Sequence, residues 1–369
     1  MSTLITEELA ELPPLAPPVV EDEPEVVRRT RPRTSEDDLT LVGSVVGSLG
    51  TSWLLYEEVL PFSGKFGFFV FWYLVFLAFY AGLTAINRPR AVVVDRVVTS
   101  LVVAAPSVVA LALGSTVVTT VAKGLRALVH WNFFTSDMSG VRPSDAYSTG
   151  GAAHAMVGTL IEVSIAVAIA MPLGVITAVY MSEVGGAAAK LVRTVVEAMT
   201  ALPSIVAGLF IYTVLIRNLH FPTCGFAAAL ALAVMGLPIM ARASDVVLRV
   251  VPGGLREASY ALGAGKFQTV WKVVLPTARP GLATALILGI ARMVGETSPL
   301  ILTSGASTFM NWNPFRNPMN SLPLYIYSAV SSGEPRYEVR GYGAAVVLLV
   351  IVLALFLLAR LVARGRTRS

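Results

Sequence analysis

Eight apolar segments, each about 20 residues long, dominate this sequence and limit the folds that the chain can adopt. A helix of about 20 mostly apolar residues spans the hydrocarbon layer of a bilayer. Hydrophobic residues make up 55% of the chain and charged residues only 14%, against roughly 25% charged in soluble domains. We therefore predict an all-α, polytopic membrane protein. The predicted spans are 41–60, 66–86, 97–121, 155–181, 194–216, 225–248, 281–303 and 343–363.

The basic residues predict how these spans are oriented. Alternate gaps carry Lys and Arg, whereas the long gaps 122–154 and 304–342 carry mixed charges and many Pro, Asn and aromatic residues. Because cytoplasmic loops carry an excess of Lys and Arg, this alternation places both termini in the cytoplasm. Omitting the first span would turn the basic loops outward, so eight spans fit better than seven. The net charge of +5 then needs no nucleic-acid partner.

Two further parts precede the main body of the chain. Residues 1–40 combine acidic, Pro-rich and Arg-rich stretches, with too little apolar surface to offset the entropy of ordering. We predict a disordered cytoplasmic tail, whose arginines are a topology signal or contact anionic lipid headgroups. The two spans within 41–90 are separated by a short gap, which predicts an additional N-terminal transmembrane hairpin.

The sequence lacks the residue constellations of common catalytic and metal sites. The single cysteine, Cys224, cannot form an intramolecular disulfide or a multi-cysteine metal site. The segment 263–266 looks like the end of a phosphate-binding P-loop, but Tyr260 and Phe267 occupy positions where that motif requires Gly and Ser or Thr. We predict no catalytic residue, metal or cofactor for this chain. Three widely separated histidines are predicted to be interfacial: His130, His154 and His220.

The gap 251–279 differs from the other short gaps because it contains a helical pattern. Gly263 suits the left-handed end of a first short helix. Pro276 is expected to stop a second helix, and Pro280 to begin the next span. Both helices are predicted to be amphipathic, from residues that recur at intervals of three and four: Leu255, Ala258, Ser259 and Leu262, then Phe267, Val270, Trp271 and Val274.

Two interpretations of the aromatic side chains in this loop remain open. Phe267 and Trp271 either lie at the membrane interface, where aromatic residues are common, or help to fill a groove on another protein. A DNA-binding helix-turn-helix fits poorly, because both ends of the loop are held at the bilayer.

The same loop resembles the E-A-A-x3-G-x9-I-x-L-P motif of ABC importer permeases. The matching residues are Glu257, Ala258, Gly263, Leu275 and Pro276, whereas Ser259 and Val273 replace Ala and Ile. The resemblance implies a type I ABC importer transmembrane fold, with six core helices in addition to the N-terminal pair. It places the permease region at 91–369 and its core at about 154–364. It also implies that the loop 251–279 docks onto an ATPase subunit.

A second resemblance concerns the substrate. The run A-R-M-V-G-E-T-S-P-L at 291–300 resembles the A-R-x-x-G-E-T-A-P-L signature of PstA-type permeases of phosphate importers, with Ser298 in place of Ala. This implies a subunit of the bacterial cell membrane. The implied partners are a homologous PstC-like permease, two PstB-like ATPase subunits that use ATP, and an external PstS-like phosphate-binding protein.

Charged residues within the predicted spans indicate where an anion could pass. Arg292 lies roughly 16 Å into its span at 1.5 Å per residue, near the bilayer midplane. Glu296 follows one turn later, and Arg242 lies about 10 Å from the inner end of the preceding span. Because the guanidinium group matches phosphate oxygens, we predict that Arg242 and Arg292 line an anion pathway and that Glu296 holds Arg292. The alternative is that these charges only tie helices together.

Three other charged residues have simpler explanations. Glu162 lies within a span towards its outer end, where we expect it to pack helices, with a role in an outer gate as the alternative. Arg193 and Glu197 lie at an inner helix end and are expected to extend to the interface.

Other functions agree with parts of the sequence. A permease for another oxyanion, such as molybdate or sulfate, would share the loop 251–279 but not the run at 291–300. A secondary transporter or membrane scaffold needs no ATPase and would have no use for the loop. A membrane enzyme is disfavoured because no catalytic constellation occurs.

Overall fold

The computed structural model describes residues 35–59 and 64–364. The chain divides into two compact units, Met1–Leu111 and Ala112–Ser369, and each is described by itself. Most of the tail predicted to be disordered, 1–40, lies outside the described residues. Its last residues were assigned wrongly, because the first helix begins at Ser35. The first unit contains α2 (Ser35–Trp53), η1 (Leu54–Val59), α3 (Lys65–Asn87) and the start of α4 (Arg90–Leu128).

Small side chains let α2 and α3 approach each other closely. A Cβ at Gly47 would lie 2.9 Å from a ring carbon of Phe79, so only glycine fits there without movement. The indole Nε1 of Trp72 donates to Ser48 Oγ at 3.1 Å. Such small residues are typical of helix contacts in membranes, where lipid provides no hydrophobic drive for association.

Charges at one end of the first unit are paired. Asp37 accepts from Arg88 Nη2 at 3.3 Å and also pairs with Arg96. The Tyr73 hydroxyl donates to the carbonyl of Ser100 at 3.1 Å and so joins α3 to α4. These bonds hold α2, α3 and the first part of α4 together.

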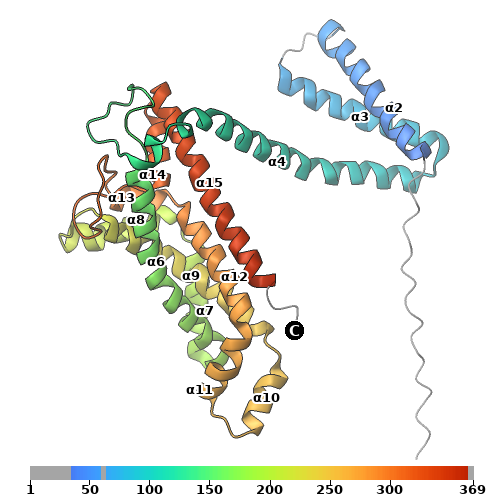
Figure 1. Ribbon diagram of the computed structural model, residues 1–369. Helices are drawn as coiled ribbons and strands as arrows, with labels where there is room; N and C mark the ends of the chain where they lie inside the picture. The colour runs from blue at the N-terminus through green and yellow to red at the C-terminus, as the bar shows by residue number, and fades with distance from the viewer. Residues whose placement is uncertain (1–34, 60–63, 365–369) are drawn as a thin grey trace, which may run out of the picture. The chain divides into compact units, whose positions relative to one another are not determined.

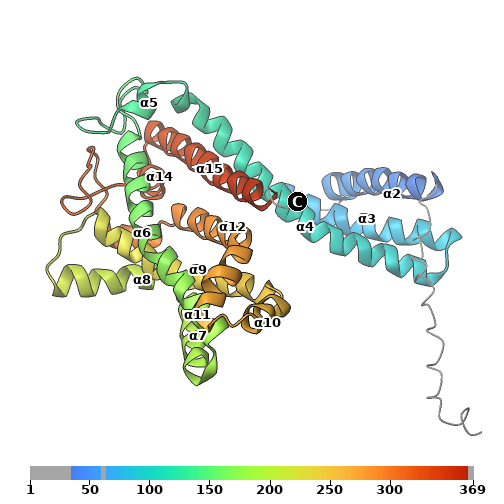
Figure 2. The same ribbon diagram turned by 60° about the horizontal axis from the view of Figure 1, so that its bottom comes forward.

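The second unit contains the remaining helices. They are α5 (Asn132–Thr135), α6 (Ala153–Val179), η2 (Tyr180–Val184), α7 (Gly186–Thr200), α8 (Ser204–Ile211), η3 (Tyr212–Asn218), α9 (Gly225–Val250), α10 (Gly253–Ala261), α11 (Lys266–Thr269), η4 (Val270–Val274), α12 (Leu275–Val294), α13 (Ser298–Thr303), α14 (Leu322–Ser331) and α15 (Pro335–Arg364). The helices α6 and α12 both pack against α9 (Figure 1; Figure 2).

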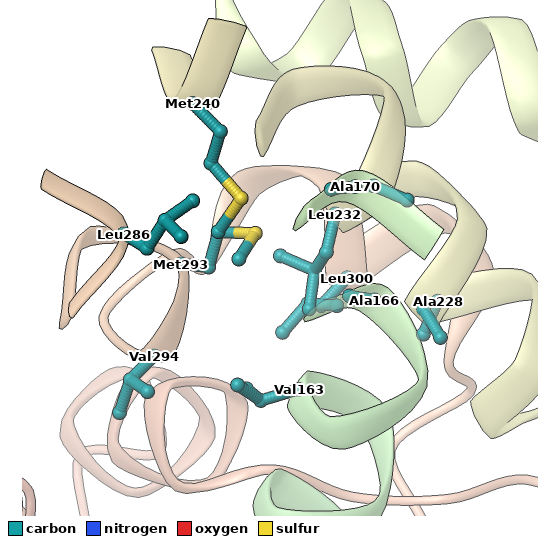
Figure 3. Packing of buried hydrophobic residues seen from close by; sticks show 12 residues of the cluster. Val163, Ala166, Ala170, Ala228, Leu232, Met240, Leu286, Met293, Val294 and Leu300 are labelled. Carbon is teal, nitrogen blue, oxygen red and sulfur yellow. The ribbon is translucent and has the colours of Figure 1, made fainter. Parts of the chain in front are cut away.

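The core of the second unit is formed by alanine, glycine and a few large apolar side chains. Gly174 on α6 approaches Met240 and the backbone of Ala241 on α9 so closely that a Cβ would lie 2.9 Å from Met240. Met293 from α12 is almost fully buried in the same cluster, and its side chain lies beside that of Met240 (Figure 3). Short side chains on α6 and α9 therefore bring the two backbones together, and methionines fill the space towards α12.

Seven of the eight predicted spans are helices that are long and apolar enough to cross a membrane. The predicted span 194–216 is different, because it is made of two helical segments, Gly186–Thr200 and Ser204–Asn218, bent by 101°. Pro203 lies in the break between them, and its missing N–H and fixed φ prevent a continuous helix. The predicted span 281–303 is also wrong at both ends, since its helix is already under way at Lys266 and ends at Val294.

The segment after α13 forms a tight junction with the beginning of α6. Met319 N donates to Ser304 O at 2.9 Å, and an isolated bridge joins Gly305 to Met319. A Cβ at Gly158 on α6 would overlap the carbonyl oxygen of Asn320. Glycine is therefore required for α6 to pass this backbone.

The same region corrects the prediction for one histidine. His154 is not an interfacial side chain but is only 3% exposed. Its ring meets that of Tyr325 edge to face, with 5.5 Å between the centroids. Asn320, just before α14, also lies against the ring, with its Nδ2 3.5 Å from His154 Nε2. These are long-range contacts that the sequence pattern does not encode.

A buried arginine holds the long loop that precedes α6. Arg340 on α15 is 1% exposed, and its Nη2 donates to the carbonyls of Ala146 at 2.7 Å and Thr149 at 2.8 Å. These bonds to backbone oxygens satisfy part of the guanidinium and fix the loop against α15.

We predict that Gly158→Ala destabilises the protein by about 1–3 kcal/mol, the usual cost of overpacking, because the added methyl meets a backbone oxygen. Thermal unfolding of the purified protein in detergent would measure this. Gly114→Ala on α4 is the control, since a Cβ there meets nothing within 4 Å. Equal unfolding temperatures for the two variants would contradict the close approach.

Candidate functional site

The loop predicted to meet a partner is a defined helical hairpin. The helices α10 and α11 are joined by Gly263, whose φ of 82° lies in the left-handed region, as the sequence predicted. Gly263 N donates to Tyr260 O at 2.9 Å, and Ala264 N donates to Ser259 O at 3.1 Å. The hydroxyls of Ser259 and Thr269 lie 2.9 Å apart. The hairpin is therefore fixed by its own bonds.

The prediction that Pro276 stops the second helix is wrong. The segments α11, η4 and α12 form one continuous helical run, Lys266–Val294, in which Pro276 is near the start of α12 and Pro280 lies inside it. The turn Val270–Val274 before Pro276 is π-helical. A wider turn relieves the clash between a proline ring and the carbonyl four residues earlier. One helix thus connects the loop to Arg292.

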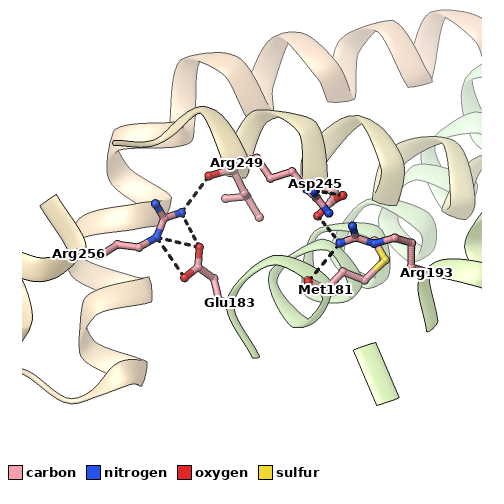
Figure 4. A network of polar contacts seen from close by, with 7 residues as sticks. Met181, Glu183, Arg193, Asp245, Arg249 and Arg256 are labelled. Atoms are coloured by element: carbon pink, nitrogen blue, oxygen red, sulfur yellow. Dashed lines mark hydrogen bonds and ion pairs between the residues drawn. The ribbon is translucent and has the colours of Figure 1, made fainter. Parts of the chain in front are cut away.

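Arg256 anchors the loop to the body of the protein. Its Nη2 lies 2.7 Å from Glu183 Oε1, and it also donates to the carbonyls of Val251 at 2.7 Å and Leu248 at 3.0 Å. Figure 4 shows the Arg256 side chain reaching from the loop to Glu183. The side chains of Glu183 and Arg256 are only 6% and 21% exposed. This charged, largely buried contact ties α10 to η2.

A second ion-pair cluster lies beside this anchor. Asp245 on α9 accepts from Arg193 Nη2 at 3.4 Å and from Arg249 Nε at 3.0 Å. Arg193 also donates to the carbonyl of Met181 at 3.3 Å (Figure 4). Arg193 was predicted to extend to the interface, and its contact with Asp245 was not predicted. An acid four residues before Arg249 was the available signal, because acid before base is the favourable order on a helix.

The loop exposes apolar side chains that no described part of the chain covers. Leu262, Phe267 and Trp271 are 89%, 74% and 57% exposed. The two aromatic rings pack edge to face, with centroids 6.1 Å apart. They border an apolar cavity of about 500 Å³ against the end of α6, whose lining includes Val175, Ile176, Val179 and Leu275. Such a surface requires lipid or another protein to cover it.

The structure places Arg292 at the end of its helix rather than at mid-span. Because α12 ends at Val294, Glu296 lies in the break before α13 and not one helical turn further on. Arg292 Nε and Glu296 Oε1 are nevertheless 3.9 Å apart, with the arginine side chain 63% exposed and the glutamate 17% exposed. The pair joins the end of α12 to this break, and the guanidinium remains accessible.

Arg242 lies on α9, at a position along the helix axis close to that of Arg292 on α12. The helices α9 and α12 are antiparallel, since Gly236 faces Met293 and Gly289 faces Met240. Arg242 and Arg292 are therefore separated by roughly 8 Å along the helix axes at 1.5 Å per residue. Arg242 is exposed and forms no hydrogen bond or ion pair with any residue that the structure describes. No described bond joins the two arginines.

The chain matches a known family of transport proteins. A family model described as "Binding-protein-dependent transport system inner membrane component" matches residues 170–368. The chain belongs to this family. The match includes the whole hairpin, its anchor and Arg292. The apolar helices of the chain agree with an inner membrane component.

Individual relatives of this inner membrane component agree. The chain is 39% identical over 249 residues to "Phosphate transport system permease protein PstA 1" of Mycobacterium tuberculosis, covering 67% of this chain and 81% of the relative. It is 39% identical to PstA of Mycobacterium leprae, over 63% and 76% of the two chains. A solved inward-facing MetNI methionine ABC transporter aligns at 24% identity with a TM-score of 0.47, over 59% and 95% of the chains.

We predict that Arg256→Gln loosens the hairpin of this inner membrane component. Loss of a charged hydrogen bond of about 1.5–3 kcal/mol should raise amide hydrogen exchange in 251–264 by roughly 10- to 100-fold. Lys272→Gln, at an exposed lysine of η4, is the control. Combining Arg256→Gln with Glu183→Gln should add little further exchange. Unaltered exchange in the single variant would show that the anchor does not hold the loop.

Proposed function

We propose that this chain is a membrane-spanning subunit of an ATP-driven importer of inorganic phosphate. The observation that carries the proposal is 39% identity over four fifths of a relative named as a phosphate permease. The accessible Arg292 guanidinium next to Glu296 supports it, because a planar guanidinium fork matches the oxygens of phosphate. The subunit resides in the bacterial cell membrane with both termini in the cytoplasm.

The pathway for the anion passes the end of α12. Arg292 attracts phosphate, and Glu296 holds the guanidinium in place while limiting how tightly it binds the anion. Arg242, exposed about one and a half turns away along α9, supplies a second cation. A pathway of this kind needs attraction strong enough to admit the ion and weak enough to release it.

Coupling to ATP occurs through the hairpin. Its exposed Leu262, Phe267 and Trp271 fit a groove on an ATPase subunit, the mode in which an amphipathic helix buries its apolar face. The continuous helix from Lys266 to Val294 then transmits movement of the loop to Arg292. ATP is bound and hydrolysed by two separate ATPase subunits, not by this chain. A second, homologous permease and an external phosphate-binding protein complete the complex.

Arg292→Gln tests the pathway. We expect phosphate uptake by proteoliposomes that contain the full complex to fall roughly 10- to 100-fold, the loss of a charge-assisted bond, while the complex still assembles. Arg279→Gln, at another exposed arginine of α12, is the control and should transport normally. Unchanged uptake in the Arg292→Gln variant would show that this residue is not part of the anion pathway.

Competition experiments distinguish a phosphate importer from a permease for another oxyanion and from a secondary transporter. Unlabelled phosphate should inhibit the uptake of radioactive phosphate, whereas molybdate and sulfate should not. A strong effect of either oxyanion would favour another substrate. Uptake that continues without ATP would favour a secondary transporter.

Trp271→Ala tests the docking surface. Buried tryptophans at interface centres contribute about 2 kcal/mol or more, so affinity for the ATPase subunit should fall by roughly 30-fold or more. Trp131→Ala is a matched control, because Trp131 is 78% exposed and lies far from the hairpin in sequence. Equal retention of the ATPase by both variants during purification would argue that Trp271 faces lipid.

A further inference from the structure

A carboxyl group is completely buried where α6 meets the segment after α13. Glu162 has no exposed surface. Its Oε1 lies 2.6 Å from Ser304 Oγ, and its Oε2 has no hydrogen-bond partner among the described residues. An ionised carboxylate with a single neutral hydrogen bond in such a place would cost several kcal/mol.

The number of hydrogens available to Ser304 Oγ limits which hydrogen bonds it can form. Ser304 Oγ also lies 2.6 Å from the carbonyl oxygen of Met319. A serine hydroxyl has one hydrogen to donate, and a carbonyl oxygen can only accept. Ser304 can therefore donate its hydrogen to only one of its two neighbours. The other hydrogen bond requires a hydrogen that the neighbouring group donates to Ser304 Oγ. Only Glu162 can supply it, as the O–H of a neutral carboxylic acid.

We propose that Glu162 is protonated, and that its acid O–H donates to Ser304 while Ser304 donates to Met319. We name these three residues and their two bonds the α6 latch. Glu162 is a positioning residue in this proposal, because it is buried and acts through Ser304. Only the transport experiment below depends on the proposed phosphate importer.

The α6 latch joins α6 to the two ends of the segment 304–319. Ser304 comes directly after α13, which begins two residues beyond Glu296. Thr303 accepts at its carbonyl from Cys224 N at 3.1 Å, at the start of α9. A bond to Ser304 therefore fixes the break that holds Glu296 relative to α6 and α9.

No described cation is paired with Glu162 to stabilise an ionised carboxylate. The elements packed against α6 are chiefly η2, α9, α12, α14 and α5, and no ion pair joins Glu162 to a described residue of any of them. On α9, residues 225–241 contain no ionisable side chain. Apart from Glu162 itself, the ionisable side chains on these elements and on α6 are His154, Tyr180, Glu183, Arg242, Asp245, Arg249, Arg279, Arg292, Tyr325 and Tyr327.

Opening of the latch is consequently linked to a proton. A glutamate side chain in water is ionised at pH 7, whereas the latched acid is neutral. The closed junction thus binds one proton more than the open one. By linkage, raising the pH favours the open junction and lowering it favours the closed one.

Infrared difference spectroscopy of the purified protein tests the protonation directly. Subtracting the spectrum of Glu162→Gln from that of the unaltered chain should leave the C=O band of a protonated carboxylic acid. Glu197→Gln, at an exposed glutamate of α7, should give only carboxylate bands. Ser304→Ala should shift the acid band, since its hydrogen-bond acceptor is lost. A carboxylate signal from Glu162 would overturn the proposal, whatever the transported substrate.

Transport by the full complex tests the positioning role. Glu162→Gln keeps an N–H donor, so we expect this variant to transport phosphate. Its uptake should no longer show the part of the pH dependence that arises from Glu162. Glu162→Leu has no donor and should lose roughly ten-fold or more of the uptake. Identical pH profiles for the unaltered chain and Glu162→Gln would overturn the linkage. If phosphate is not transported at all, the infrared result still stands and only the proposed function fails.

Discussion

The close contact between α6 and α9 is the constraint on which the second unit depends. Gly174 and the alanines of both helices allow the two backbones to approach until larger side chains would overlap. In a membrane, where lipid is as apolar as the side chains, such packing replaces the hydrophobic effect as a source of specificity. The parallel course of α6 and α9 then determines where α12 and the junction at Asn320 can lie.

Several charged and conformationally special residues lie where helices break. Arg292 and Glu296 flank the end of α12, Pro203 separates the two halves of a bent pair, and Arg256 binds the free carbonyls at the end of α9. Within a membrane protein, non-helical backbone is tolerated only where protein or water satisfies its polar groups. The breaks therefore supply the polar groups on which the proposed anion pathway depends.

Much of the fold could be predicted because helix length and hydrophobic periodicity are local properties. Seven spans and the hairpin with Gly263 at its turn follow directly from residue spacing. Errors arose where neighbouring structure overrides a local rule. Pro276 was expected to stop a helix, but a preceding π-helical turn accommodates its ring. His154 was placed at the interface, although contacts from α14 bury it.

The sequence by itself determined a multi-pass membrane chain and a helical loop that turns at Gly263. Only the tertiary structure decided which distant polar groups meet. Glu183 and Arg256 are 73 residues apart in sequence, and Glu162 and Ser304 are 142 apart. Periodicity reports which face of a helix is apolar, but the partner of a buried charge is chosen by how the helices pack, and that choice depends on the whole chain.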